Sequence, residues 1–268
     1  MTPAYNAIPK FLATTSYRNP SASAPFNLAY KTDQPVFEWR KHNPENAKAG
    51  QAFMAAQRTG QRSIWEGDRV PLSDLSLSGS ELDAGRVLLV DVGGGFGHQC
   101  IDLRRLNPDI KGHMITQDLP LVHNMLDNAD ELKALDIEPM EHDFMKPQPV
   151  HGAKVYYLRN VIHNWNDSGS EIILKQVRQA LAEDSVVMID DVVMPRVGAT
   201  WKQASMDIAM MTMLAAMERT KEQFRQLLLS AGLELRDVWT YDEEYGDSLL
   251  VAVPAPEDRG VADLENSA

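Results

Sequence analysis

The glycine-rich segment Asp-Val-Gly-Gly-Gly-Phe-Gly-His, at residues 91–98, constrains the fold of this chain more than any other feature. It follows a run of β-branched residues and leucines at 86–92 and opens a helical pattern at about 97–107. A strand, a glycine turn and a helix in this order are typical of the first unit of a doubly wound α/β sheet, which binds its ligand at this turn. Glycine suits the turn because the backbone needs positive φ and must approach the ligand closely.

The rest of the chain after residue 86 alternates short apolar runs with helical patterns. This alternation predicts an α/β fold of the Rossmann-like type, a mainly parallel sheet covered by helices on both faces. The last two apolar runs are joined by a connection too short for a helical crossover, so we expect them to form an antiparallel pair at one edge. The further strand runs lie at 113–116, 154–158, 185–190, 233–239 and 248–253, and the further helical patterns at 119–134, 168–182, 201–217 and 220–231.

Residues 1–80 differ from the rest because proline recurs there often enough to keep helices short. Apolar residues between the prolines, such as Phe11, Phe26 and Trp65, predict several short helices packed on a neighbouring structure. We therefore predict three parts. They are an N-terminal helical segment at 1–80 with substrate-side or dimer contacts, a ligand-binding domain at 81–254, and a disordered polar tail at 255–268.

Charge balance and cysteine count exclude several classes of function. Lys and Arg number 26 against 38 Asp and Glu, a formal net charge of −12. Such an acidic chain lacks the counter-charge that nucleic acids and anionic membranes require, so we expect neither as a partner. The single cysteine, Cys100, excludes an intramolecular disulfide and a multi-cysteine zinc site. Without an apolar run of about 20 residues or a signal-peptide pattern, we expect a cytoplasmic protein.

The spacing of the glycines indicates which ligand the turn binds. Gly93, Gly95 and Gly97 form G-x-G-x-G behind Asp91, whereas the dinucleotide fingerprint would need a small residue where His98 stands. No Gly-Lys-Ser/Thr follows, so a P-loop is excluded as well. An acidic strand end suits a ligand that is neutral or cationic near the loop, and S-adenosylmethionine, with its ammonium and sulfonium groups, fits that description. The alternative is a tight turn that binds no ligand.

Asp118 lies just past the second strand run, about 20 residues beyond the glycine loop. An acid at that offset typically accepts hydrogen bonds from ribose hydroxyls. The alternative is a capping residue for the helix that begins at Leu119 and Pro120. Both roles are compatible with the sequence.

Four segments together resemble the S-adenosylmethionine-dependent O-methyltransferases of the plant caffeate type and their fungal secondary-metabolite relatives. The resemblance runs in order over about residues 5–253. It implies a class I methyltransferase fold, with seven mostly parallel strands and an antiparallel last strand. The segments are LVDVGGGFGH, QDLP, HDFMKPQPVHGAKVYYLRNVIHNW and ERTKEQFRQLLLSAGL.

The resemblance implies roles for the residues that match the family's cofactor site. By this match, Gly93 and Gly95 face the methionine part of S-adenosylmethionine, and Asp118 faces the ribose. Asp143 and Phe144, in HDF, match the pair that flanks the adenine.

The resemblance also implies a catalytic set. His163, in HNW, matches the family's base, and Arg159 stands where the family has a lysine that contacts the cofactor. The two acids that buttress the base match Asp191, one methylene shorter than the usual glutamate, and Glu218 in ERT. Asn164 replaces the aspartate that usually follows the base.

His163 follows a strand run at the carboxyl edge of the sheet, where open α/β folds bind their ligands. A free-base imidazole there can remove a proton from a phenolic or enolic hydroxyl as its oxygen attacks the methyl group. The alternative for His163 is a hydrogen-bonded helix cap. Asp190 and Asp191 point to opposite faces of a strand, so we expect no metal site there.

For some residues the sequence is compatible either with a role in lining a substrate pocket or with a role in packing the core. Five methionines in 206–217 suit either the wall over a flat aromatic substrate or a buried helix. Trp165 and Trp201 fit either a pocket wall or the core. Cys100 is expected to be a small buried hydrophobe.

The first hypothesis is an O-methyltransferase that acts on a small aromatic or polyketide hydroxyl. A second keeps the cofactor but catalyses a pericyclic, dehydrating or decarboxylating step, because some fungal relatives do so. A third is a non-catalytic partner of another methyltransferase. Family members generally begin with a winged-helix dimerisation domain that this sequence lacks, so the expected assembly is either a homodimer or a heteromer with a related chain.

Overall fold

The computed structural model describes residues 2–18, 20, 22–46, 48–50, 62–67, 69–70 and 72–256. Residues 257–268 of the expected disordered tail therefore lie outside the described residues. Among the described residues, no helix has the length and apolar character needed to cross a membrane.

The sheet confirms the predicted α/β fold. Its strand order is β3-β2-β1-β4-β5-β8-β7, and the short β6 pairs with β5 outside this path. β8 runs antiparallel to both β5 and β7, which confirms the antiparallel pair at one edge, while the other pairings are parallel. The strands are β1 Val87–Val92, β2 His113–Asp118, β3 Ile137–Glu141, β4 Val155–Arg159, β5 Val186–Met194, β6 Arg219–Thr220, β7 Leu233–Asp242 and β8 Asp247–Pro254.

β3 and the two-residue β6 were missing from the expected strand runs, and one predicted helix is wrong. β3 carries Pro139 and two exposed glutamates, which an edge strand tolerates because one side of its backbone is unpaired. The expected helix at 119–134 is two short helices, α7 Pro120–His123 and α8 Ala129–Ala134. Between them, the side-chain amide of Asn128 donates to the carbonyl of Phe96 at 2.9 Å, which ties this connection to the glycine loop.

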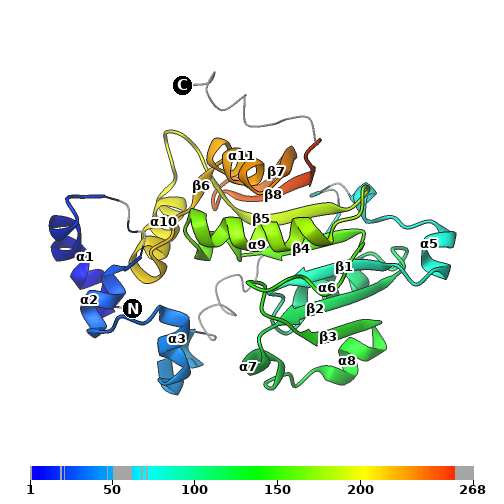
Figure 1. Ribbon diagram of the computed structural model, residues 1–268, viewed down its shortest axis with the longest axis horizontal. Helices are drawn as coiled ribbons and strands as arrows, with labels where there is room; N and C mark the ends of the chain where they lie inside the picture. The colour runs from blue at the N-terminus through cyan, green and yellow to red at the C-terminus, as the bar shows by residue number, and fades with distance from the viewer. Residues whose placement is uncertain are drawn as a thin grey trace.

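The remaining predicted helices are close to their expected bounds. α6, α9 and α11 cover the sheet, whereas α10 lies beside the N-terminal helices (Figure 1). One face of the sheet packs against α9 and α11, where Phe224 and Leu228 are fully buried. The other packs against α6 and the segment around Trp65, and Cys100 is buried there as expected. These helices are α6 His98–Leu106, α9 Asp167–Ala180, α10 Trp201–Leu214 and α11 Lys221–Ser230.

The N-terminal part of the chain contributes to both ends of the molecule. Figure 1 shows α1 Thr2–Thr14 and α2 Pro25–Tyr30, in blue, beside the yellow α10, whereas α5 Gly79–Asp83 lies at the opposite end. Phe26, Tyr30 and Trp39 form an aromatic cluster with ring centroids 4.8 to 5.4 Å apart. Trp39 belongs to α3 Val36–Lys41, and η1 Leu72–Leu75 adds the buried Leu75 to the core beside Trp65.

Candidate active site

The glycine loop connects β1 to α6 at the carboxyl edge of the sheet. The backbone N–H groups of Gly93 and Gly94 both donate to the carbonyl of Gln117, at 2.8 and 2.9 Å, which fixes the loop against the end of β2. Gly95 has φ +60° and no atom within 4 Å of the position that a Cβ would take. The loop therefore leaves open space beside its backbone, where a ligand can approach.

Asp91 lies beneath this loop and is 1% exposed. A Cβ on Gly94 would stand 2.5 Å from the carboxylate of Asp91 and from Oγ1 of Thr116, so only glycine fits there. Burial raises the pKa of Asp91 to about 7, and the guanidinium of Arg159 opposes the rise. Oγ1 of Thr116 is buried with no hydrogen-bond partner among the described residues.

Asp118 is positioned by two backbone donors. Its Oδ2 accepts from the N–H of Gly95 at 2.9 Å, and its Oδ1 accepts from the N–H of Leu119 at 2.7 Å. Burial raises the pKa of Asp118, and these two hydrogen bonds oppose the rise. Leu119 is itself the capping position of α7 and has no side-chain cap, so Asp118 does not serve as the cap. Each oxygen keeps a second lone pair for a ligand hydroxyl.

Phe144 connects the glycine loop to an aromatic stack. A Cβ on Gly93 would lie 3.5 Å from its ring, and the ring meets Trp165 edge-on at a centroid distance of 6.0 Å. Trp165 in turn stacks on Phe37 of α3 at 6.4 Å, so this tryptophan packs between the N-terminal helices and the loop. Oδ1 of Asp143 accepts from the N–H of Met145 at 3.0 Å, which shapes the turn after β3.

Arg159 ends β4 and pairs with Asp190, its register neighbour on β5, at 3.3 Å. Asp190 is fully buried and also accepts from the hydroxyls of Tyr157 at 2.6 Å and Tyr241 at 2.5 Å. Burial lowers the pKa of Arg159, but the facing carboxylate of Asp190 outweighs it, and the net direction is upward. The sequence predicted a cofactor contact for Arg159 but not its ion pair with Asp190.

His163 lies in the 3-10 turn η2 Ile162–Asn164, directly after β4, and is 6% exposed. Its Nδ1 is 2.9 Å from Oε1 of Glu218, which is also buried. Because a carboxylate can only accept, this contact assigns the ring proton to Nδ1 and gives the lone pair to Nε2. The structure therefore brings together the expected base and one of its two expected acids.

Asp191, the other expected acid, meets the backbone of His163 and not its ring. Its Oδ2 accepts from the His163 N–H at 3.1 Å, and its Oδ1 is buried with no hydrogen-bond partner among the described residues. Burial raises the pKa of Asp191 to about 7, and the nearby His163 opposes the rise. Asp191 and its neighbour Asp190 have different partners, because Asp190 pairs with Arg159 and two tyrosine hydroxyls, whereas Asp191 contacts the backbone of His163.

Within the described part of the chain, no group of three or more His, Cys, Asp or Glu residues has the arrangement of a metal site.

The methionine-rich helix α10 contacts the site through Asp207, a residue for which the sequence analysis predicted no role. Asp207 accepts from the backbone N–H of Glu218 at 2.9 Å, and burial raises its pKa. Its only sequence signal is a lone carboxylate in an otherwise apolar run. Trp201 is 73% exposed, so its expected role in the core is wrong. Its exposure follows from its place at the first residue of α10.

The residues around the loop fit S-adenosylmethionine. The space beside Gly95 admits a ligand against the backbone, and Asp118 offers carboxylate lone pairs at the edge of that space. The buried Thr116 hydroxyl has no hydrogen-bond partner among the described residues. The acids Asp91 and Asp118 favour a ligand without anionic phosphates on this side of the loop.

A family model described as an O-methyltransferase domain matches residues 18–234. The demethylsterigmatocystin 6-O-methyltransferase of Aspergillus parasiticus is 37% identical over 254 residues, covering 94% of this chain and 63% of that protein. The solved structure of LepI in complex with SAM is 35% identical with a TM-score of 0.83, covering 94% of this chain and 63% of that chain.

A further solved structure, described as a pericyclic reaction enzyme, is 32% identical with a TM-score of 0.82 and covers 94% of this chain and 64% of that chain. The chain therefore spans a little under two thirds of the length of each of these three relatives.

Proposed function

This chain belongs to the O-methyltransferase domain family, and we propose from that premise that it methylates a hydroxyl of a small aromatic or polyketide molecule. The match agrees with the resemblance read from the glycine loop and from the HNW and ERT motifs. The observation that carries the proposal is the 2.9 Å contact between Nδ1 of His163 and Glu218, because it prepares Nε2 to accept a proton.

One half of the site binds and orients the cofactor. Gly93 and Gly95 face the methionine part of the cofactor through their backbone, and Asp118 accepts from the ribose hydroxyls. Asp143 and Phe144 flank the adenine, and Phe144 is supported from behind by Trp165. When bound, S-adenosylmethionine supplies a methyl group on an electrophilic sulfonium.

The acceptor half moves a proton. Nε2 of His163 takes the proton of the acceptor hydroxyl as its oxygen becomes the nucleophile, and the carboxylate of Glu218 stabilises the resulting imidazolium. Since Glu218 and His163 are both buried, their attraction acts in a medium of low polarity and is stronger than in water. Holding the oxygen and the methyl group in line supplies a large part of the rate.

A calorimetric titration with S-adenosylmethionine, followed by transfer of a labelled methyl group to a panel of phenols and hydroxylated polyketides, tests the proposal. We expect binding, transfer to at least one acceptor, and loss of transfer with retained binding in His163→Ala. The matched control is His151→Ala, which removes an exposed histidine and should leave transfer intact. Full residual turnover in His163→Ala would overturn the assignment of the base.

One observation favours a second function. A solved structure described as a pericyclic reaction enzyme is 32% identical to this chain with a TM-score of 0.82, which supports a pericyclic step as the second candidate. Conversion of a polyketide without formation of S-adenosylhomocysteine would support this second candidate. Absence of cofactor binding would instead favour a non-catalytic partner of another methyltransferase.

A further inference from the structure

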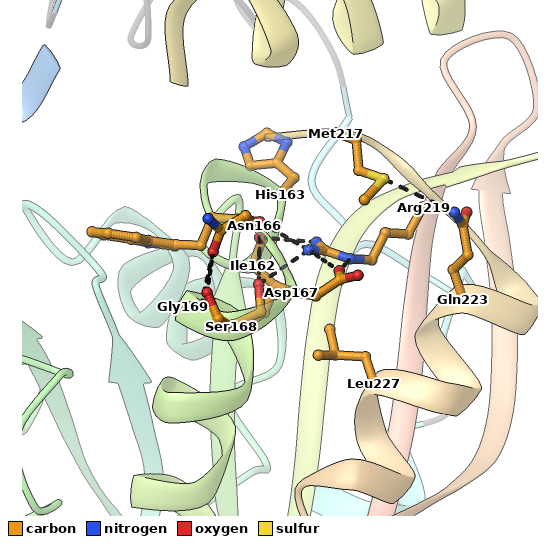
Figure 2. Close-up of polar contacts among 12 residues, drawn as sticks. Ile162, His163, Asn166, Asp167, Ser168, Gly169, Met217, Arg219, Gln223 and Leu227 are labelled. Atoms are coloured by element: carbon orange, nitrogen blue, oxygen red, sulfur yellow. Dashed lines mark hydrogen bonds and ion pairs between the residues drawn. The ribbon is translucent and has the colours of Figure 1, made fainter. Parts of the chain in front are cut away.

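Arg219 is fully buried and reaches the turn that carries His163 (Figure 2). Its Nη2 donates to the carbonyl of Trp165 at 2.8 Å, and its Nη1 donates to the carbonyl of Ile162 at 3.2 Å. These two carbonyls lie on either side of His163. One guanidinium therefore fixes the backbone both before and after the proposed base.

Two further groups complete this arrangement. Oδ1 of Asp167, at the first residue of α9, accepts from Nε and Nη2 of Arg219 at 3.0 and 2.8 Å. The hydroxyl of Ser170, which is fully buried, lies 3.3 and 3.2 Å from the same carbonyls of Ile162 and Trp165 and can donate its one proton to either. The N-terminal turn of α9 and the side chain of Arg219 thus hold the two carbonyls together.

Adjacent residues hold the ring and the backbone of His163. Glu218 contacts Nδ1 of the imidazole, and its neighbour Arg219 binds the carbonyls that flank the histidine. If the backbone of the turn shifts, the ring moves relative to Glu218, because both contacts depend on the same short segment. A displacement of about 1 Å at a reacting group can lower a rate on the order of a hundredfold.

The cost of burying the charge of Arg219 also indicates a role other than stabilising the fold. Burying a guanidinium is costly, and a buried ion pair is often matched in stability by apolar residues of similar volume. The carboxylate of Asp167 is largely exposed, with 68% of its side chain accessible. Its attraction for the guanidinium is therefore screened by water and offsets less of the cost of burying the charge of Arg219. The forked geometry of arginine, which reaches two carbonyls and a carboxylate at once, is not available to an apolar residue or to lysine.

We propose that Arg219 is a positioning residue that holds His163 in register with Glu218. The inference rests on the proposed function, in which His163 is the base. Its experiment therefore needs a readout that does not require turnover.

The experiment compares Arg219→Gln and Arg219→Lys with Arg178→Gln in the full chain. Arg178 is the matched control because its Nε donates to a carbonyl, that of Gly232, at 2.9 Å from the last turn of the same helix α9. We measure kcat, KM for the cofactor, and the NMR signal of the Nδ1 proton of His163, assigned by its absence from His163→Gln.

We expect Arg219→Gln to lose the Nδ1 proton signal and to lower kcat on the order of tenfold to a hundredfold, with KM for the cofactor changed by less than about twofold. Arg219→Lys, which keeps the charge but not the fork, should recover part of kcat. Arg178→Gln should keep both the signal and kcat. A retained signal and unchanged kcat in Arg219→Gln would overturn the inference.

If Arg219→Gln does not fold, the decision passes to Arg219→Lys and Asp167→Asn, which remove fewer of the contacts. A wild-type signal and wild-type kcat in both would then overturn the inference. If the wild-type chain transfers no methyl group, the proposed function fails, and the Nδ1 proton signal still decides whether Arg219 positions His163.

Discussion

Replacing Asp191 by asparagine should stabilise this protein at alkaline pH, although the side chain is buried beside the proposed base. The carboxylate is fully buried, and among the described residues only its Oδ2 has a hydrogen-bond partner, the backbone N–H of His163. Burial raises its pKa from an ordinary 3.8 to about 7. An asparagine of nearly the same shape can accept the same hydrogen bond without ionising.

The direction in which stability changes with pH follows from the number of protons that the folded and unfolded chains bind. Between pH 4 and pH 7 the folded chain holds a proton on Asp191 that the unfolded chain has released, so stability falls as pH rises through this window. The contribution is fully present below about pH 4 and is lost above pH 7. A rise in pKa from 3.8 to about 7, at about 1.4 kcal/mol per unit, corresponds to about 4 kcal/mol.

The amide recovers most of this amount. The hydrogen bond from the His163 N–H is already part of this pKa shift, so we expect a net gain of about 4 kcal/mol at pH 8. At pH 4, where the carboxyl is neutral in the folded state, the two proteins should differ by less than about 1 kcal/mol.

Urea unfolding of the wild type and Asp191→Asn at a series of pH values between 4 and 8 measures this difference. Titrating groups that are not coupled to Asp191, such as Asp91, contribute to both proteins and cancel in the difference curve. His163, Glu218 and Asp190 are coupled to Asp191, so the difference curve reports this whole cluster. Asp33→Asn, which removes the carboxylate of an exposed residue, serves as the matched control. A difference that is independent of pH, or a variant less stable at pH 8 than the wild type, would refute the reasoning.

Three further changes should have measurable effects. Asp118→Ala should weaken cofactor binding by at least about tenfold, or 1.4 kcal/mol; unchanged affinity by calorimetry would contradict its ribose role. Gly94→Ala places a Cβ 2.5 Å from Asp91 and Thr116, so it should lower thermal stability more than Gly95→Ala, which adds only left-handed strain of about 1 to 2 kcal/mol. Equal losses would show that the space under the loop can relax. Phe224→Ala, at a fully buried position, should cost about 3 to 5 kcal/mol in urea unfolding.

The fold was largely predictable because its elements have local signatures. Strands buried on both faces read as continuous apolar runs, and β1, β4 and β5 were found in this way. β3 lacks that signature because it is an edge strand with Pro139 and exposed glutamates. The break between α7 and α8 follows from a contact with Phe96, about thirty residues away in the sequence, which no local pattern announces.

The placement of the candidate site residues was predictable where it follows from position along a strand, and not where it depends on partners distant in the sequence. Asp118 and His163 stand just at or after strand ends, so their place at the carboxyl edge follows from topology. Asp207 and Asp190 carry only a weak signal, a polar residue inside an apolar run. Their roles depend on Glu218 and Tyr241, which fold beside them from other elements.

The two acids near His163 show why the roles of neighbouring carboxylates could not be separated from the sequence. Asp191 lies on β5, next to the end of β4, and its short side chain reaches the peptide N–H of His163. Glu218 approaches from the segment before β6, and its longer side chain reaches the ring. Because backbone and ring are held from different elements, a shorter acid at position 191 leaves the ring contact intact. The departure from the family's glutamate therefore does not remove the partner that a base needs.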